Sequence, residues 1–239
     1  MASTRLEGKL LLEVNGKSIL QRVWEQVIKC TKLDKIIIAT DSEELLTHAK
    51  GFNAAVELSS PQHQSGTDRC AEVAMRYPEF DIIINVQGDE PFIQPSQLEL
   101  LIQLLALDTV QIASLLTRIY ENAELQNPAV VKVTMDNGGK ALYFSRHAIP
   151  FQRNVRKEDW YKTYPYYKHL GLYGFKRNSL LDVSKLSTSS LERAECLEQL
   201  RWMENGFAIH LAETNIPSIG IDTSEDLDKA RLYAIKNNL

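Results

Sequence analysis

The stretch DIIINVQGDEPF (81–92) decides the fold class of this 239-residue chain. DIIINV (81–86) is a short and mostly apolar run, which is typical of a central parallel strand covered on both faces. Gly88 then permits a tight turn, and Asp89 and Glu90 follow at the carboxyl edge of the expected sheet. Because open parallel sheets bind their ligands at that edge, the stretch predicts an α/β sheet and the place of its binding site.

Strand and helix signals alternate through the first half of the chain. IIIAT (36–40) and AAVEL (54–58) are strand-like, and SGTDRCAEVAMR (65–76) begins with capping residues and continues with a helical grouping of apolar positions. Ser96 and Glu99 have the spacing of a capping box, which predicts a helix that starts there. This alternation predicts a three-layer, mostly parallel Rossmann-like sheet with right-handed crossovers.

The second half has a different character, because strand-like segments follow one another closely. DNGG (136–139) predicts a hairpin between two of them. The pattern of residues 189–206 predicts one helix that starts with a capping box. IGIDT (219–223) is predicted to form a short strand before the last helix. We therefore expect one domain over residues 1–239, with an inserted β-rich lobe at about 130–178. The strand-like segments are VQIASLL (110–116), VVKVTMD (130–136), ALYFS (141–145), KHLGLYGF (168–175) and FAIHLAE (207–213).

Composition and charge argue against several classes of protein. Hydrophobic residues make up 44% of the chain and charged residues 24%, as in ordinary soluble globular proteins. The formal net charge of −4 argues against a nucleic-acid-binding surface, which needs clustered basic residues. No apolar run is long enough to span a bilayer and no signal-peptide pattern is present, so we expect no membrane insertion. Three cysteines without a metal-binding spacing indicate reduced thiols in a cytoplasmic protein.

Two aspartates that follow predicted strands are candidates for a metal site. Asp89 comes after the strand at 81–86, and Asp222 ends the strand at 219–223. Two carboxylates at strand ends can hold Mg²⁺, which takes oxygen ligands and bridges phosphates. The structural alternatives are a turn with solvated acids for Asp89 and a helix cap for Asp222, although Thr223 can also serve as that cap. The residues leave both interpretations open.

Two loops have the composition of loops that bind phosphates or bases. MASTRLEGK (1–9) combines small residues and hydroxyls with the cations Arg5 and Lys9. HQSGTDR (63–69) places small residues and hydroxyls at a helix start, where backbone N–H groups can meet a phosphate or a base edge. The structural alternative for the second loop is simple capping of the helix by its serine or threonine hydroxyl.

A strand in the second half carries polar side chains that suit a ligand. In KHLGLYGF (168–175), strand alternation puts His169 on the same face as Tyr173. Two such groups projecting together favour binding of a polar molecule, although an ordinary sheet face has the same pattern.

Three further polar residues are also candidates for binding a polar ligand. In LEQLRW (197–202), Glu198 and Gln199 lie off the apolar stripe of the predicted helix, as they also would on a solvated face. Arg146 follows a predicted strand and can meet a carboxylate through two parallel hydrogen bonds.

Taken together, these segments resemble the 3-deoxy-manno-octulosonate (Kdo) cytidylyltransferases, or CMP-Kdo synthetases. The matching segments cover essentially the whole chain in the family's order. ASTR, QGDEP and the final DT-x-EDL are shared with sugar-acid cytidylyltransferases in general, whereas HLG-x-YG together with LEQLR singles out the Kdo branch. The segments are ASTRLEGK (2–9), ATD (39–41), HQSGTDR (63–69), NVQGDEPF (85–92), ALYFSRHAIP (141–150), YKHLGLYGF (167–175), LERAECLEQLRW (191–202) and GIDTSEDL (220–227).

The resemblance implies that the chain transfers CMP from CTP to Kdo, releasing pyrophosphate, in the cytoplasm and for lipopolysaccharide biosynthesis. It also implies a nucleotidyltransferase fold, a homodimer to which the β-rich lobe contributes, and Mg²⁺ as the cofactor. Such a reaction needs positioning and charge neutralisation more than a covalent intermediate. The implied catalytic residues are Arg5, Lys9, Asp89 and Asp222, of which Asp89 and Asp222 hold the metal; the nucleotide-binding residues are Ser65, Gly66, Arg69 and Gln87; the sugar-acid-binding residues are Arg146, His169, Tyr173, Glu198 and Gln199.

The chain departs from the family pattern near its start. The family's phosphate loop follows a hydrophobic strand ending in Ile-Pro-Ala-Arg, which does not precede Ser3, and EGKL (7–10) stands where relatives have Pro-Gly-Lys-Pro. We therefore expect the start of this sequence to lie inside a longer reading frame. We also expect a marginal or partly disordered sheet, because the missing strand would lie in its middle and leave the strands at 36–40 and 82–86 with unpaired backbone groups. Glu7 would weaken triphosphate binding if it points inward.

Two alternatives stay open at this point. Within the same class, the substrate is 8-amino-Kdo or another sugar acid; HLGLYGF and LEQLR disfavour sialic acid but do not separate Kdo from its 8-amino analogue. In a different class, the chain is an inactive, truncated nucleotide-binding homologue that has lost its first strand. Pyrophosphate release from CTP with each candidate sugar acid distinguishes these possibilities.

Overall fold

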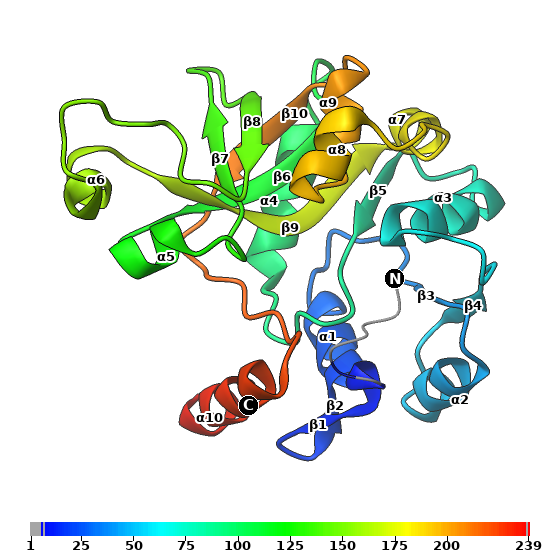
Figure 1. Ribbon diagram of the computed structural model, residues 1–239. Helices are drawn as coiled ribbons and strands as arrows, with labels where there is room; N and C mark the ends of the chain where they lie inside the picture. The colour runs from blue at the N-terminus through cyan, green and yellow to red at the C-terminus, as the bar shows by residue number, and fades with distance from the viewer. Residues whose placement is uncertain (1–5, 7, 238) are drawn as a thin grey trace. The chain divides into compact units, whose positions relative to one another are not determined.

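Most of the predicted strands and helices are present in the computed structural model, which describes residues 6, 8–237 and 239. The chain forms two units, shown in Figure 1. Unit 1 comprises Met1–Phe80, Asn85–Glu99 and Ser218–Leu239, and unit 2 comprises Asp81–Ile84 and Leu100–Pro217. The α/β class is confirmed, and the larger sheet is mixed, so it has fewer parallel strand pairs than the sequence predicts.

Unit 1 begins with a tight hairpin that the alternation of strands and helices did not reveal. Asn15 and Gly16 both have positive φ angles, 51° and 76°, as a two-residue hairpin turn requires. The Ser18 hydroxyl then accepts a hydrogen bond from the backbone of Gln21 and so caps the first α-helix. These first elements are η1 (Lys9–Leu11), β1 (Glu13–Val14), β2 (Lys17–Ser18) and α1 (Ile19–Val27).

A two-stranded parallel sheet forms the next part of unit 1. β3 (Ile38–Thr40) pairs with β4 (Val56–Leu58), and α2 (Glu43–Gly51) connects them. α3 (Gly66–Arg76) follows. Among the strands that the structure describes, β3 pairs with β4 alone and β5 (Ile82–Asn85) pairs with β9 alone, while the expected marginal sheet stays a prediction.

The end of the chain closes the core of unit 1. α10 (Ser224–Lys236) begins with a capping box in which Thr223 and Asp226 bond each other's backbone N–H groups. Its buried face packs against the hairpin and the first helix, which explains why the N- and C-terminal segments form one unit. This core consists of Val14, Ile19, Phe92, Ile221, Leu227, Ala230 and Ala234.

Unit 2 is built on a sheet with the strand order β10-β6-β9-β7-β8, to which β5 adds through β9. β10 and β6 are parallel, whereas β9 runs antiparallel to both β6 and β7. The predicted hairpin at 136–139 joins β7 to β8, with the Asp136 carboxylate accepting hydrogen bonds from two backbone N–H groups of the turn. The strands are β6 (Ile112–Arg118), β7 (Lys132–Met135), β8 (Ala141–Ser145), β9 (Tyr167–Lys176) and β10 (Ile209–Glu213).

Helices cover both faces of this sheet. Alternate residues of β9 face opposite sides. A Cβ atom built on Gly174 would lie 2.6 Å from Leu105, which is in α4 (Pro95–Leu105). The rings of Tyr173 and Phe175 instead contact Trp202 of α9 (Gln199–Glu204), with centroid distances of 5.0 and 5.4 Å. The C-terminal part of α4 and α9 therefore lie on opposite faces, as Figure 1 shows.

The long connection between β8 and β9 has a small core of its own. Trp160 and Tyr166 stack with a centroid distance of 6.3 Å and are both buried. The elements of this part of unit 2 are α5 (Asn122–Gln126), η2 (Lys157–Asp159) and α6 (Trp160–Thr163), and α7 (Arg177–Val183) follows β9. The core residues are Ile119, Leu125, Ala148, Trp160 and Tyr166.

The segment predicted as one helix over 189–206 is two helices. α8 (Ser190–Glu195) has the predicted capping box, but it ends at Cys196, whose φ angle of 52° is left-handed. α9 then starts a new helix. The Arg146 guanidinium explains the break, because it donates to the backbone oxygens of Glu195 and Cys196 at 2.7 and 3.2 Å, which a continuous helix would need for its own bonds.

Two further boundaries also differ from the prediction. IGIDT is not a strand, because within the described residues one backbone hydrogen bond, from Ile221 N to Asp89 O at 3.0 Å, ties it to its neighbour. α4 starts at Pro95 and not at Ser96, since proline suits the first helical position and the Gln97 side chain bonds the backbone of Gln94. Among the residues that the structure describes, none of the helices combines the length and apolar character needed to cross a bilayer.

Candidate functional site

Unit 1 brings together the lysine and the two aspartates that the sequence predicts. Lys9 Nζ lies 2.5 Å from Asp89 Oδ2 and 2.8 Å from Asp222 Oδ1, so one ammonium group bridges both carboxylates. The exposed fraction of the side chain rises from 12% for Lys9 to 26% for Asp89 and 57% for Asp222. The lysine side chain is therefore less exposed than the two carboxylate side chains, which are accessible to solvent.

Local backbone structure explains this convergence. Gly8 has a φ angle of 63° and is the N-cap of η1. Lys9 is therefore the first residue of this helical turn. The hydrogen bond from Ile221 N to Asp89 O holds the two carboxylate-bearing segments side by side. Thr223 caps α10, so the alternative role of Asp222 as the cap is not taken up, and its carboxylate is available for the cation.

The electrostatics of the cluster favour a charged lysine. Burial alone would lower the pKa of Lys9, but hydrogen bonds to Asp222 and Asp89 outweigh it and raise the pKa above its ordinary value. Burial raises the pKa of the neighbouring Glu90 to about 7, opposed by a hydrogen bond with Ser218 and reinforced by the charge of Asp89. Glu90 thus adds less negative charge beside the pair than an ordinary carboxylate would.

The two carboxylates fit a hard divalent cation. They already share one cation, and Mg²⁺ at nucleotide sites is usually held by one or two carboxylates together with phosphate oxygens and water. Within the described part of the chain, no group of three or more His, Cys, Asp or Glu side chains is placed to hold a metal. Asp89 and Asp222 would therefore hold Mg²⁺ with substrate oxygens completing its coordination.

The predicted nucleotide loop lies at the start of α3, also in unit 1. The Ser65 hydroxyl accepts a hydrogen bond from the Asp68 backbone at 3.1 Å, so the structural alternative of a helix cap holds for this side chain. Gly66 lies against Gln87, because a Cβ built on the glycine would come within 3.5 Å of the Gln87 amide and 3.8 Å of the Asn85 amide. An exposed glycine next to two amides leaves room for a flat polar group such as a base.

Arg69 is fixed by residues that the sequence did not single out. It donates to Asp41 at 2.8 Å and to Ser59 at 2.5 Å, which ties α3 to the ends of β3 and β4. Within the same loop, His63 bonds the Glu72 carboxylate, which also accepts from the Ser60 backbone at 2.8 Å. These bonds hold the loop in place.

In unit 2, the structure confirms that His169 and Tyr173 share a face of β9, with a centroid distance of 5.2 Å. Between them β9 bulges, and the Ser114 hydroxyl spans the bulge by contacting His169 Nε2 at 2.8 Å and the Leu172 oxygen at 2.8 Å. Burial lowers the pKa of His169 to about 3, so the imidazole is neutral at physiological pH.

Glu198 and Gln199 belong to the same neighbourhood. Burial raises the pKa of Tyr173 well above its ordinary value, and the charge of Glu198 adds to this effect. Gln199 is buried, with 5% of its surface exposed, so it does not lie on a solvated helix face. Among the described residues, the buried Tyr173 hydroxyl and the buried Trp202 indole N–H have no hydrogen-bond partner. Such unpaired groups are typical of a site built for a polar ligand.

Arg146 is engaged by the protein in this structure. Its guanidinium donates to the backbone oxygens of Glu195, Cys196 and Pro128. The Glu195 carboxylate accepts from the Arg146 backbone at 2.9 Å and from the Ser145 hydroxyl at 2.7 Å. The role of Arg146 on a substrate carboxylate stays a prediction, whereas its contact with the α8–α9 junction is observed.

The buried Lys132 completes this arrangement. Its Nζ donates to the backbone oxygens of Asn127, Val130 and Arg146 at 2.9, 2.6 and 2.5 Å. Burial, together with the charge of Arg146 and against the opposing charge of Glu195, lowers the pKa of Lys132 to about 8.

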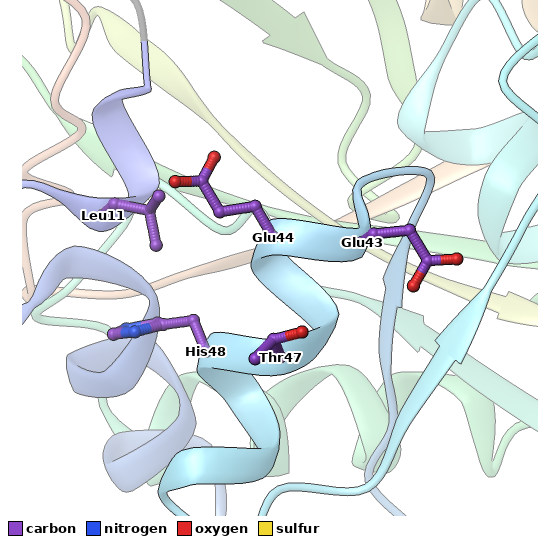
Figure 2. A pocket seen from close by; sticks show the side chains of 5 residues that line it. All are labelled: Leu11, Glu43, Glu44, Thr47 and His48. Carbon is purple, nitrogen blue, oxygen red and sulfur yellow. The ribbon is translucent and has the colours of Figure 1, made fainter.

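A cavity of about 650 Å³ in unit 1 does not contain the predicted site residues. It is lined by Leu11 of η1 and by Glu43, Glu44, Thr47 and His48 of α2. Figure 2 shows Glu44 and His48 extending toward Leu11. Two glutamates would repel a triphosphate, so this cavity is not the nucleotide site. Arg5, the remaining predicted catalytic residue, and Glu7 lie outside the described residues.

Comparison with known proteins settles the family. The family model described as "Cytidylyltransferase" matches residues 1–214. The chain belongs to the cytidylyltransferase family. A curated relative from Cytophaga hutchinsonii, named 3-deoxy-manno-octulosonate cytidylyltransferase, is 43% identical over 95% of this chain and 91% of its own length. A relative of the same name from Bacteroides thetaiotaomicron is 45% identical over 99% of this chain and 95% of its own length.

A solved structure agrees with these sequence relatives. The CMP:2-keto-3-deoxy-manno-octonic acid synthetase complexed with CTP has a TM-score of 0.91 and 36% identity, over 98% of this chain and 95% of its own. A glucose-1-phosphate thymidylyltransferase from Bacillus anthracis has a TM-score of 0.66 at 13% identity and supports the fold alone. The resemblance inferred from the motifs is therefore confirmed, and this cytidylyltransferase is a nucleotidyltransferase by fold and by family.

The structure of this cytidylyltransferase adds residues that sequence reasoning missed. Ser114 had one available signal, a hydroxyl inside an apolar strand, and Lys132 had a similar one. Asp41 and Glu195 lie inside two of the matching segments, but no spacing links them to their partners Arg69 and Arg146, which are distant in the sequence.

Proposed function

We propose that this cytidylyltransferase transfers CMP from CTP to Kdo and releases pyrophosphate. The convergence of Lys9, Asp89 and Asp222 carries the proposal, because an Mg²⁺–nucleotide complex needs two carboxylates and a cation close together. The names of the relatives that are 43% and 45% identical support Kdo as the sugar acid. The solved synthetase complexed with CTP supports CTP as the nucleotide.

The chemistry assigned to the residues is positioning and charge neutralisation. In the reaction, the anomeric oxygen of the sugar acid bonds to the α-phosphorus of CTP, the bond to the β-phosphate oxygen breaks, and the hydroxyl proton is released. Asp89 and Asp222 would hold Mg²⁺, and the bound ion would neutralise phosphate charge and make the attacking hydroxyl more acidic. Lys9 and Arg5 neutralise the triphosphate and the leaving pyrophosphate.

The remaining predicted residues orient the two substrates. Gly66 and Gln87 border the cytosine, while Ser65 and Arg69 keep α3 and its loop in place. His169, Tyr173 and Glu198 form hydrogen bonds to hydroxyls of the sugar acid. Arg146 and the buried Gln199 complete the set of sugar-acid-binding residues. Arg146 also fixes the α8–α9 junction.

Release of pyrophosphate tests the proposal directly. The protein is incubated with CTP and Mg²⁺ and with Kdo, 8-amino-Kdo or sialic acid in parallel. We expect the highest kcat/KM with Kdo. A higher value with 8-amino-Kdo would reassign the sugar acid within the class. No release with any of them would favour an inactive nucleotide-binding homologue.

We further propose that the enzyme is a cytoplasmic homodimer that serves lipopolysaccharide biosynthesis. β8 lies at the edge of the unit 2 sheet, and its Leu142 is 58% exposed. Phe151, in the connection that follows, is 73% exposed. Exposed apolar side chains on the last strand of the sheet and in the connection that follows it support contact with a second copy. Sedimentation equilibrium tests this: a monomer at micromolar concentration would contradict it, and Leu142→Glu is expected to weaken the dimer.

A further inference from the structure

The position of Lys9 has a consequence for metal binding. Its Nζ lies between Asp89 and Asp222, within hydrogen-bond distance of both, in the place where a divalent cation would contact the same oxygens. An ammonium group and a dication cannot both occupy this position, because they exclude each other sterically and repel each other. Metal binding therefore requires the ammonium group to leave.

The side chain can leave without movement of the backbone around it. Leu10 and Leu12 pack against the core of unit 1 and hold the turn that carries Lys9. Lysine has a flexible stem with four rotatable bonds, so its ammonium group can swing to a new partner. A triphosphate offers several anionic oxygens and is the partner that compensates for the loss of two carboxylates.

We propose that Lys9 is an internal cation that occupies the metal position of the Asp89–Asp222 pair until the triphosphate of the nucleotide draws it away. Metal binding to the protein without nucleotide is thereby weakened, and binding of nucleotide and metal is coupled beyond the affinity of the two for each other. The inference rests on the proposed function, since it assigns the two carboxylates to a metal. By linkage, the coupling acts equally in both directions.

Mn²⁺ titration without nucleotide tests the inference directly. Free Mn²⁺ is measured by electron paramagnetic resonance for the parent protein, for Lys9→Met and for Lys17→Met. Met keeps the length of the side chain but removes its charge. Lys17 is the matched control, because it is a lysine of the same unit that pairs with Glu25 on an exposed surface.

Lys9→Met is expected to bind Mn²⁺ at least about tenfold more tightly than the parent, whereas Lys17→Met is expected to match the parent. Mg²⁺ is expected to raise the unfolding temperature of Lys9→Met more than that of the parent, since only the folded variant presents two unpaired carboxylates. CTP, corrected for the Mn²⁺ that it chelates alone, is expected to tighten Mn²⁺ binding by a larger factor in the parent than in Lys9→Met. Lys9→Gln, measured in parallel, gives the answer if Lys9→Met is not folded by circular dichroism.

Equal or weaker Mn²⁺ binding by the folded Lys9 variants, relative to the parent, overturns the inference. Its failure is distinct from failure of the proposed function, which pyrophosphate release by the parent reports. An active parent whose Mn²⁺ affinity does not respond to Lys9 substitution retains the function and loses the inference. An inactive parent with tighter Mn²⁺ binding in Lys9→Met loses the function and keeps the competition.

Discussion

Gly174 and Gly171 lie on the same strand and provide a matched pair of substitutions. A Cβ atom at Gly174 would lie 2.6 Å from Leu105 Cδ1 and 3.5 Å from Leu101 Cβ, and both leucines are fully buried. A Cβ atom at Gly171 would meet nothing within 4 Å. Gly174→Ala is therefore expected to overpack the contact between β9 and α4, while Gly171→Ala leaves the packing unchanged.

The magnitude follows from the cost of overpacking. One extra carbon in a closed core costs about 1–3 kcal/mol, and the smaller entropy of an alanine-containing unfolded chain returns about 0.4–1 kcal/mol. We expect Gly174→Ala to lower the free energy of unfolding by about 1–2 kcal/mol. For a chain of this length, this corresponds to a fall in Tm of roughly 2–8 °C. Gly171→Ala, which has only the entropic gain, is expected to keep the free energy of unfolding of the parent or to raise it by up to about 1 kcal/mol.

Urea unfolding followed by circular dichroism and tryptophan fluorescence measures both variants. The clash is identified by a double-mutant cycle with Leu105→Ala, which removes the colliding methyl group. The double variant is expected to be more stable than the sum of the single effects by about 1 kcal/mol. Equal stabilities of Gly174→Ala and Gly171→Ala, or strictly additive effects with Leu105→Ala, would refute the packing argument.

Three further predictions concern the proposed site. Asp89→Ala should lower kcat for pyrophosphate release at least about a hundredfold, because it removes half of the cation-binding pair; turnover within a few-fold of the parent would contradict the assignment. Glu195→Gln should cost about 1–3 kcal/mol of stability in urea unfolding and raise KM for the sugar acid but not for CTP, since an amide cannot accept from both Ser145 and the Arg146 backbone. His169 has a folded-state pKa of about 3, below its unfolded value of 6.5, so stability should fall as pH drops from about 6.5 toward 3. In His169→Gln, the slope of the free energy of unfolding against pH should be smaller than in the parent by at most about 1.4 kcal/mol per pH unit. An identical slope would count against a buried neutral imidazole.

The sequence predicts the strands of this protein well because their signals are local. ALYFS is a strand with the predicted bounds, and DNGG forms the predicted hairpin. Period-two patterns and turn residues act over a few positions, so they are visible without knowledge of the fold. The short hairpin at Asn15–Gly16 also has such a local signal, an Asn-Gly pair whose two residues both adopt positive φ angles.

The helix break at Cys196 shows what sequence patterns cannot supply. The apolar spacing of residues 189–206 is helical throughout, and a capping box marks its start. The break depends on Arg146, about fifty positions earlier, which takes the carbonyl oxygens that the helix would use. Tertiary contacts of this kind override local propensity, and they leave no periodic trace.

Only part of the site could be predicted from the sequence, because its remaining contacts are also tertiary. The strand-end positions identified Asp89 and Asp222 as a candidate metal pair, and the resemblance added Lys9 to the same catalytic site. That one ammonium group joins both carboxylates depends on the fold, because it needs the backbone bond between Ile221 and Asp89. The networks around Ser114 and Glu195 likewise consist of partners from different elements.

Lys9, Asp89 and Asp222 are far apart in the sequence, which affects when their cluster can form. Lys9 is separated by 80 residues from Asp89 and by 213 from Asp222. During synthesis on the ribosome, the first two residues emerge long before the third, so a nascent chain carries a lysine and one aspartate without the second. Contacts of such high sequence separation form late in folding. The order of translation therefore delays this cluster until Asp222 has been made, and a chain whose synthesis stops before Asp222 lacks it.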